Sequence, residues 1–487
     1  MFNNKQKSWQ IVYSNFTGIQ RRAIEFLNTE LSKYLLRSAE ACEYHTLPIL
    51  KQAKNLSLDK NAIILSTYED SLFLPRYIKK EEVPQDGYLL KVIDNPTSPQ
   101  HSLVLITATK EQALFYGAVA FIDKYVALHG PFHNALYFSD KTFDEKMKPA
   151  TITSSHKTKN RGVFAWGHPI NDYRAYIKNM ARLGLNRLIL WNDFKPLNAD
   201  EIVEYAHSYG IKVLWGFAWG WTSGHCDLES IDDEFLQSLK KQVICTFEQN
   251  YANLGDGLYF QSFTERTDDK INGKSVASTV TRFVNDTASE LLSKYPNLQL
   301  EFGLHAMSVK NSLNEIANID KRVNIIWEDA GCFPYSYSPD FCDEEKFSKA
   351  LEITKKFIEL RGNDAPVGFM FKGFSTIDWS IKPFSHQRGP FILGEASNEL
   401  SLFDKKMRGS QWRNFSADWI KNGDYARRLA DFINNQTNGN AQLYMAEIFD
   451  DNNVVPYAVC SEIFWNADRS YEQILNDTLK KNIVTFN

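Results

Sequence analysis

The sequence of 487 residues lacks the features that mark several large classes of protein. Its six cysteines are widely scattered and show no paired C-x-x-C spacing, which argues against a disulfide scaffold and a structural zinc site. We therefore expect free, buried thiols. No run of about 20 apolar residues is present, so we expect no membrane-spanning helix. The N-terminus lacks the apolar core of a secretion signal, which indicates a soluble, cytoplasmic protein, or a secreted or periplasmic one if a leader has been removed.

A strong excess of charge of one sign is also missing. The formal net charge is −4 and no stripe rich in Lys and Arg occurs, so nucleic acid is not an expected partner. Neither G-x-G-x-x-G nor G-x-x-x-x-G-K-S/T is found, which argues against the common dinucleotide- and phosphate-binding turns. The absence of H-E-x-x-H and of G-x-S-x-G argues against catalytic zinc and a serine nucleophile. We expect neither a cofactor nor a metal.

Aromatic residues are abundant, with 11 Trp, 22 Tyr and 33 Phe. A large aromatic core accounts for some of these rings, and others can line a cleft where the faces of sugars stack. The chain is also too long for one ordinary core, which favours two domains or one large barrel with additions.

Residues 1–150 predict a small α/β domain, because short apolar runs alternate there with helical periodicity. The expected helices cover 21–38 and 111–122, and the expected strands cover 62–65, 87–92 and 102–107. The polar stretch 151–160 is typical of a linker.

Residues 151–487 show a repeating strand–helix rhythm that predicts a (β/α)8 TIM barrel with a C-terminal helical segment. Seven strands are expected at 162–166, 187–191, 212–217, 257–263, 299–304, 323–327 and 367–371. Helices are expected between them at 173–183, 199–209, 233–251, 275–294, 311–319 and 344–360. Residues 442–449 and 457–460 compete for the eighth strand.

Two of these strands end in carboxylates, at the edge where a barrel enzyme keeps its chemistry. Glu265 follows the fourth strand, where nearby apolar residues such as Phe263 would raise its pKa and suit it to act as a general acid. Glu328 and Asp329 follow the sixth strand and, being adjacent, point to opposite sides, so one of them is the candidate for a second catalytic carboxylate. Glu328 is slightly favoured.

Other strand ends carry aromatic and hydrogen-bonding residues that suit the mouth of a sugar-binding barrel. A lysine or arginine there needs an acidic partner or the carboxylate of an acidic substrate. The candidate substrate-binding residues are Trp166, His168, Asn192, Asp193, Trp219, Trp221, His305, Tyr335, Lys372 and Arg388. Each has a structural alternative, such as a helix cap, a core residue or an ion pair.

Two segments resemble known glycosidases. Residues 86–92 followed by 113–121 look like the accessory domain that precedes the catalytic barrel in β-N-acetylhexosaminidases and α-glucuronidases. Residues 461–475 are similar to the closing segment of α-glucuronidases, although Ala467 stands where those enzymes usually have proline. At the fourth strand, 261–265 departs from the hexosaminidase motif H-x-G-G-D-E and from the longer α-glucuronidase signature, and keeps only the acid Glu265. The exact family is therefore unassigned.

Together the residues and the resemblance predict a glycoside hydrolase, exo-acting on a carbohydrate that contains a uronic acid or an N-acetylhexosamine. Two alternatives remain open. One is a carbohydrate-binding barrel without catalysis, and the other is a lyase or isomerase of an acidic sugar with His305 or Lys372 as base.

Overall fold

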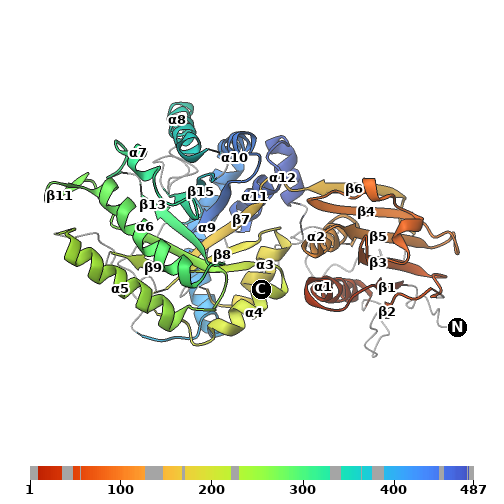
Figure 1. Cartoon of the computed structure of the whole chain (residues 1–487). Coiled ribbons are helices and arrows are strands. Elements are labelled where there is room, and N and C mark those ends of the chain that lie inside the picture. Colours follow the sequence, from red (N-terminus) through yellow and green to blue (C-terminus); the bar gives the residue numbers. More distant parts are fainter. Residues whose placement is uncertain are drawn as a thin grey trace. The chain divides into compact units, whose positions relative to one another are not determined.

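The computed structural model describes residues 9–35, 48–54, 56–126, 146–166, 170–192, 194–220, 230–305, 307–328, 342–362, 365–375, 389–448, 454–479 and 481, with backbone alone at 32–35 and 166. These residues form two compact units, the first mostly within Met1–His156 and the second mostly within Lys157–Leu475 (Figure 1). Within the described ranges, no helix is both long and apolar enough to cross a membrane.

The first unit is built on a six-stranded mixed sheet. Its strands, in the order β2-β1-β3-β5-β4-β6, are β2 (Ile49–Lys51), β1 (Trp9–Tyr13), β3 (Asn61–Thr67), β5 (Ser102–Ala108), β4 (Gly87–Asp94) and β6 (Ala150–Ser155). The first four are parallel, whereas β4 runs antiparallel to both of its neighbours. The strands β3 and β5 are buried along their whole length, because both faces of the sheet are covered.

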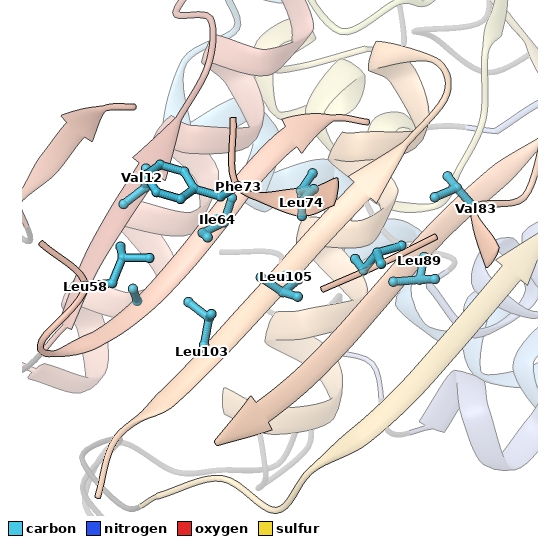
Figure 2. Close-up of a cluster of buried hydrophobic side chains, with 11 residues drawn as sticks. Val12, Leu58, Ile64, Phe73, Leu74, Val83, Leu89, Leu103 and Leu105 are labelled. Carbon is cyan, nitrogen blue, oxygen red and sulfur yellow. The ribbon is translucent and has the colours of Figure 1, made fainter. Parts of the chain in front are cut away.

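One face of this sheet packs against α1 (Gly18–Leu35) and α2 (Glu111–Phe121), which a π-helical turn at Ile122–Val126 extends. A Cβ at Gly117 of α2 would lie 2.8 Å from Ile106, so this glycine permits the helix to pack closely on the sheet. The other face is covered by side chains from the connection between β3 and β4 (Figure 2). That cluster consists of Val12, Leu58, Ala62, Ile64, Phe73, Leu74, Ile78, Val83, Leu89, Leu103 and Leu105.

The predicted linker at 151–160 was wrong for its first half. Ala150–Ser155 forms β6, which pairs with β4 from Gly87 to Val92. The strand is polar because it lies at the edge of the sheet and none of its side chains is buried. Polarity therefore reflected an edge strand and not an unstructured connection.

The second unit is a closed barrel of eight parallel strands, and it confirms the predicted fold class. Its strands in order are β7 (Asn160–Trp166), β8 (Arg187–Trp191), β9 (Lys212–Trp219), β10 (Gly257–Ser262), β13 (Gln299–Leu304), β14 (Val323–Trp327), β15 (Gly368–Phe371) and β16 (Gln442–Ala446). The eighth strand is thus the first of the two predicted candidates, and pairing of β16 with β7 closes the ring. The other candidate, 457–460, lies inside a buried helix.

Alternate residues of the strands point inward and fill the barrel. The apolar part of this interior consists of Phe164, Ile189, Trp191, Leu214, Tyr259, Ile326, Met370, Tyr444 and Ala446. The barrel is therefore a packed core, and space for chemistry is expected only at its ends.

The helices of this unit are α3 (Tyr173–Arg182), α4 (Ala199–Ser208), α5 (Asp233–Asn250), α6 (Val276–Lys294), α7 (Leu313–Ile316), α8 (Glu344–Arg361), α9 (Asn398–Asn422), α10 (Asp424–Thr437), α11 (Val454–Trp465) and α12 (Tyr471–Leu479). A short hairpin, β11 (Lys270–Ile271) and β12 (Lys274–Ser275), precedes α6. Several helices begin at an Asp or Ser side chain that accepts a backbone N–H three residues on, as at Asp232, Ser275 and Asp343. The helix predicted at 311–319 is reduced to the single turn α7.

The thiols differ in their burial. Cys460 in α11 is buried, as predicted, but Cys245 in α5 is exposed, which corrects the expectation for that residue.

Candidate active site

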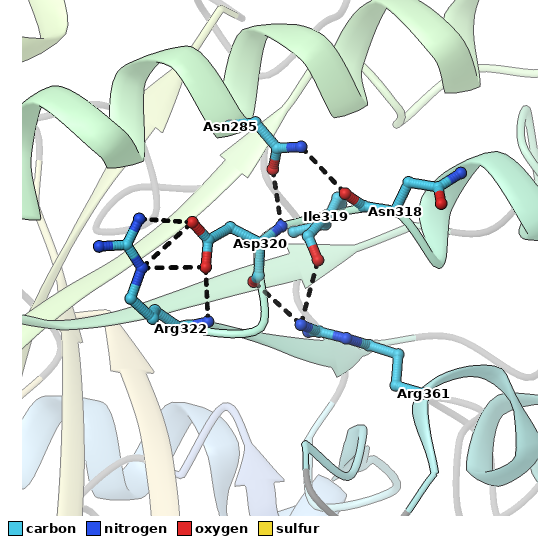
Figure 3. A network of polar contacts seen from close by, with 6 residues as sticks. All are labelled: Asn285, Asn318, Ile319, Asp320, Arg322 and Arg361. Atoms are coloured by element: carbon cyan, nitrogen blue, oxygen red, sulfur yellow. Dashed lines mark hydrogen bonds and ion pairs between the residues drawn. The ribbon is translucent and has the colours of Figure 1, made fainter.

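Glu328 directly follows β14, the sixth strand of the barrel, and the start of this strand is firmly anchored. Arg361 of α8 donates to the carbonyl of Asp320 at 2.9 Å, just before the strand (Figure 3). Asn285 of α6 accepts the backbone N–H of Asp320 at 2.7 Å, and the Asp320 carboxylate pairs with Arg322 at 2.6 Å. Contacts from α6 and α8 therefore hold the start of the strand that carries Glu328 at its other end.

The Glu328 carboxylate is buried and receives hydrogen bonds from two neighbouring strands. The side chain is 4% exposed. The Tyr259 hydroxyl donates to Oε1, and the amide nitrogen of Gln261 lies 2.7 Å from Oε1 and 2.9 Å from Oε2. His305 Nε2 lies 3.2 Å from Oε2. Tyr259 and Gln261 alternate along β10, which places both on the inner face.

These contacts keep Glu328 ionised. Burial alone would raise its pKa, but the charge and hydrogen bond of His305, the charge of Lys372 and the hydrogen bond from Tyr259 outweigh burial and lower the pKa to about 2. Burial, together with the Glu328 charge, raises the pKa of Tyr259 well above its usual range, so this hydroxyl remains a neutral donor. Glu328 therefore cannot serve as a general acid near neutral pH.

Gly303 makes room for this arrangement. It lies on the inner face of β13, and a Cβ at this position would overlap both Glu328 Oε1 and the Tyr259 hydroxyl. A residue with any side chain would displace one of the two groups, so the close approach of Tyr259 to Glu328 requires glycine here.

Glu265 stands beyond the end of β10 in a short turn held by serine hydroxyls. Ser262 Oγ donates to a carbonyl of β9 at 2.7 Å, and Ser308 Oγ donates to the carbonyl of Thr264 at 2.7 Å. The apolar setting predicted for Glu265 is not found, because its side chain is 45% exposed. Phe263 instead contacts Phe283 of α6, so its ring packs outside the barrel.

His305 connects the two predicted carboxylates. Its Nε2 lies 3.2 Å from Glu328 Oε2 and 4.0 Å from Glu265 Oε2, and its side chain is 14% exposed. Because both distances share one atom, the two carboxylate oxygens are separated by no more than their sum. This limit includes the separation of about 5 Å found in retaining glycosidases and the short end of the roughly 6.5–9.5 Å range of inverting ones.

Lys372, at the tip of the seventh strand, adds a positive charge to this cluster. It is 4% exposed, and its charge helps to lower the pKa of Glu328. The sequence predicted that a buried lysine here needs an acidic partner or a substrate carboxylate, and Glu328 supplies the acidic charge.

A second buried ion pair lies deeper in the barrel, toward the N-terminal ends of the strands. Arg187 pairs with Glu301 at 2.5 Å, and Tyr444 accepts from Arg187 and donates to Glu301, both at 2.7 Å. Burial opposes the charge of Arg187, but Tyr444 and Glu301 outweigh it and raise the Arg187 pKa. At this end of a barrel such a network is expected to support stability and not chemistry.

Trp219 is not brought to this cluster, which corrects its prediction as a sugar-binding residue. Its ring stacks on Phe260 with centroids 3.6 Å apart and meets Phe283 of α6 edge to face. Trp215, four residues earlier on the same strand, likewise stacks on Tyr251. Trp215 and Trp219 therefore share one face of β9, and this face packs against the helices outside the barrel.

Asn192, at the tip of the second strand, is buried with 2% exposure. Neither polar atom of its amide has a hydrogen-bond partner in the described part of the chain. Buried amides are seldom left without partners, so Asn192 stays a candidate for substrate binding.

The remaining predicted residues lie outside the described residues, or only their backbone is described. They are Asp329, Trp166, His168, Asp193, Trp221, Tyr335 and Arg388. Their proposed roles rest on the sequence alone.

Sequence reasoning missed four residues at or near these strand ends. Three of them, Tyr259, Gln261 and Gly303, shape the Glu328 site. Residues two apart on a strand share a face, and this alternation, counted back from the strand end, could have identified them. Glu447 follows the eighth strand, is 5% exposed and has a φ of 63°, an uncommon backbone conformation for glutamate. Its position became recognisable only once β16 was established as the eighth strand.

Within the described ranges, no group of three or more His, Cys, Asp and Glu residues is arranged to hold a metal ion. The chemistry available from the described residues is that of a buried anion, a histidine, a lysine and a half-exposed carboxyl group at one barrel mouth.

No protein-family model matches the sequence, and no curated protein matches it. Similar solved structures include the family 20 β-N-acetylhexosaminidase from Streptomyces coelicolor A3(2), with 10% identity, a TM-score of 0.49, and coverage of 98% of this chain and 91% of that one. A family 115 4-O-methyl-α-glucuronidase has 12% identity and a TM-score of 0.49, covering 98% of this chain and 59% of its own. The β-N-acetylhexosaminidase from Bacteroides fragilis has 11% identity, a TM-score of 0.45, and coverage of 96% and 86%. These structural neighbours are barrel glycoside hydrolases of the two predicted groups, and at this identity they leave the family and the activity of this chain unassigned.

Proposed function

We propose that this protein hydrolyses glycosidic bonds at the C-terminal mouth of its barrel, as an exo-acting enzyme. The observation that carries the proposal is the sharing of His305 by Glu265 and the ionised Glu328, at the tips of the fourth and sixth strands. Two carboxyl groups this close are what cleavage through an oxocarbenium-like transition state requires.

In this proposal Glu265 is the general acid, since its exposed side chain can reach a bound substrate. One member of the sixth-strand pair, either Glu328 or Asp329, supplies the negative charge that faces the developing positive charge on the sugar. Candidate substrates are glycosides of a uronic acid or of an N-acetylhexosamine, whose acid or acetamido group would meet the polar residues of the strand tips.

A panel of aryl glycosides, including α-glucuronides and N-acetylhexosaminides, tests the activity. Glu265→Gln should slow substrates with strongly basic leaving groups by about 10²–10⁴-fold, because they must be protonated to depart. A dinitrophenyl glycoside leaves without protonation and should be slowed far less. Asp268→Asn is the matched control, since this carboxylate lies three residues further on and is 74% exposed.

If Glu265→Gln slowed the turnover of both kinds of glycoside equally, the acid role of Glu265 would be contradicted. Sugar binding without turnover of any glycoside would instead favour a carbohydrate-binding barrel. Formation of an unsaturated product in place of a reducing sugar would favour a lyase.

A further inference from the structure

The acceptor capacity of Glu328 is fully used within the protein. A carboxylate offers about four lone-pair sites. Oε1 receives the Tyr259 hydroxyl and the Gln261 amide, and Oε2 receives the Gln261 amide and His305 Nε2. The side chain is also buried at 4% exposure, so a substrate could reach it only by replacing one of these donors.

This occupancy conflicts with a direct role in bond breaking. A nucleophile or general base needs a lone pair aimed at the atom that it attacks or deprotonates. The low pKa of Glu328, about 2, also makes it a weak base. Its contacts instead fix the positions of Tyr259, Gln261 and His305.

We propose that Glu328 is a positioning residue that acts through His305, holding the ring in its protonated form beside Glu265. This inference rests on the proposed function, in which Glu265 is the acid. In the step concerned, the proton moves from the Glu265 carboxyl group to the glycosidic oxygen, and the bond from the anomeric carbon to that oxygen breaks with its electron pair going to oxygen. The Glu265 carboxylate that remains lies 4.0 Å from Nε2 and is stabilised by the imidazolium charge.

The charges around the pair favour this arrangement. Among the contacts of the described residues, Glu265 and Glu328 face His305, and Tyr259 and Lys372 act on Glu328. Lys372 stabilises the Glu328 anion, and that anion in turn favours the protonated imidazole. Tyr259 stays neutral and contributes no charge.

The kinetic test follows kcat/KM against pH for the full chain and for His305→Asn, Glu328→Gln and the double variant. Loss of the imidazolium should move the alkaline limb to higher pH and lower kcat by about 10- to 100-fold, because the carboxylate form of Glu265 loses its stabilising charge. If Glu328 acts only through His305, the double variant should match His305→Asn. Tyr444→Phe is the control for general damage to the barrel interior and should leave the limb where it is, since Tyr444 contacts Arg187 and Glu301.

A direct role for Glu328 predicts different results. The proposal would be overturned if the double variant had a lower kcat than His305→Asn. It would also be overturned if azide restored turnover of Glu328→Gln with formation of a glycosyl azide. Should Glu328→Gln not fold, an unmoved alkaline limb in His305→Asn is sufficient to reject it.

A second measurement does not depend on turnover. NMR titration of the histidine ring signals in the full chain, with His305 assigned by its loss in His305→Asn, reports the charge of the ring directly. The midpoint of His305 should fall in Glu328→Gln, because the neighbouring anion is removed. An unchanged midpoint would reject the inference even if glycosides are turned over, whereas absence of turnover with a lowered midpoint would reject the proposed function alone.

Discussion

The low pKa of Glu328 links the stability of the barrel to pH. In an unfolded chain this carboxyl group titrates near 4.5, whereas in the folded protein its pKa is about 2. Folding therefore favours the ionised form. The stabilisation is fully present above pH 4.5 and is lost as the pH falls through 2.

The size of this effect follows from the two pKa values. The change from 4.5 to about 2 corresponds to about 3 kcal/mol at about 1.4 kcal/mol per pKa unit. At pH 3 the folded group is still mostly ionised while the unfolded group is mostly protonated, so about 2 kcal/mol of this contribution is already lost. The carboxylate is almost completely buried, so solvent screening does not reduce this value much.

The measurement is urea unfolding of the wild type and of Glu328→Gln between pH 7 and about pH 3. Tryptophan fluorescence is a suitable probe, since all of the 11 tryptophans except Trp9 follow residue 157 and so report on the barrel. The wild type should lose about 2 kcal/mol more than the variant over this range, because the other carboxyl groups titrate in both. Equal losses in the two proteins, within about 0.5 kcal/mol, would refute the reasoning.

Two other substitutions test the packing around the site. Gly303→Ala should lower the free energy of unfolding by about 1–3 kcal/mol and impair turnover, because the added methyl overlaps the Glu328 carboxylate. The control is Gly409→Ala in the middle of α9, where the nearest atom is 3.7 Å away. This change should be neutral or stabilise the protein by up to about 1 kcal/mol, and chemical denaturation measures both variants. Trp219→Phe should lower the unfolding midpoint through loss of contacts with Phe260 while KM stays within about twofold, since the ring packs between strands and helices. A large rise in KM would instead show that Trp219 contributes to substrate binding.

Most of the barrel was predictable because its strands are short, continuous apolar runs separated by amphipathic helices. The strands at 187–191, 299–304 and 323–327 were predicted with the bounds that the structure shows. The edge strand β6 was not, because strands exposed to solvent carry the polar residues that are also typical of linkers. The helix at 311–319 shrank to one turn because helical periodicity alone does not determine where packing ends a helix.

The sequence by itself placed Glu265, His305, Glu328 and Lys372 at strand ends, since the order of strands along the chain is enough to locate their tips. Only the tertiary structure decided that His305 lies between the two glutamates, that Gly303 makes room for Tyr259, and that Trp219 faces the helices. The reason is that both faces of a barrel strand are buried, so alternation separates two faces but hydrophobicity does not tell which of them points inward. Contacts between strands far apart in sequence depend on how the ring closes, and no local pattern records that.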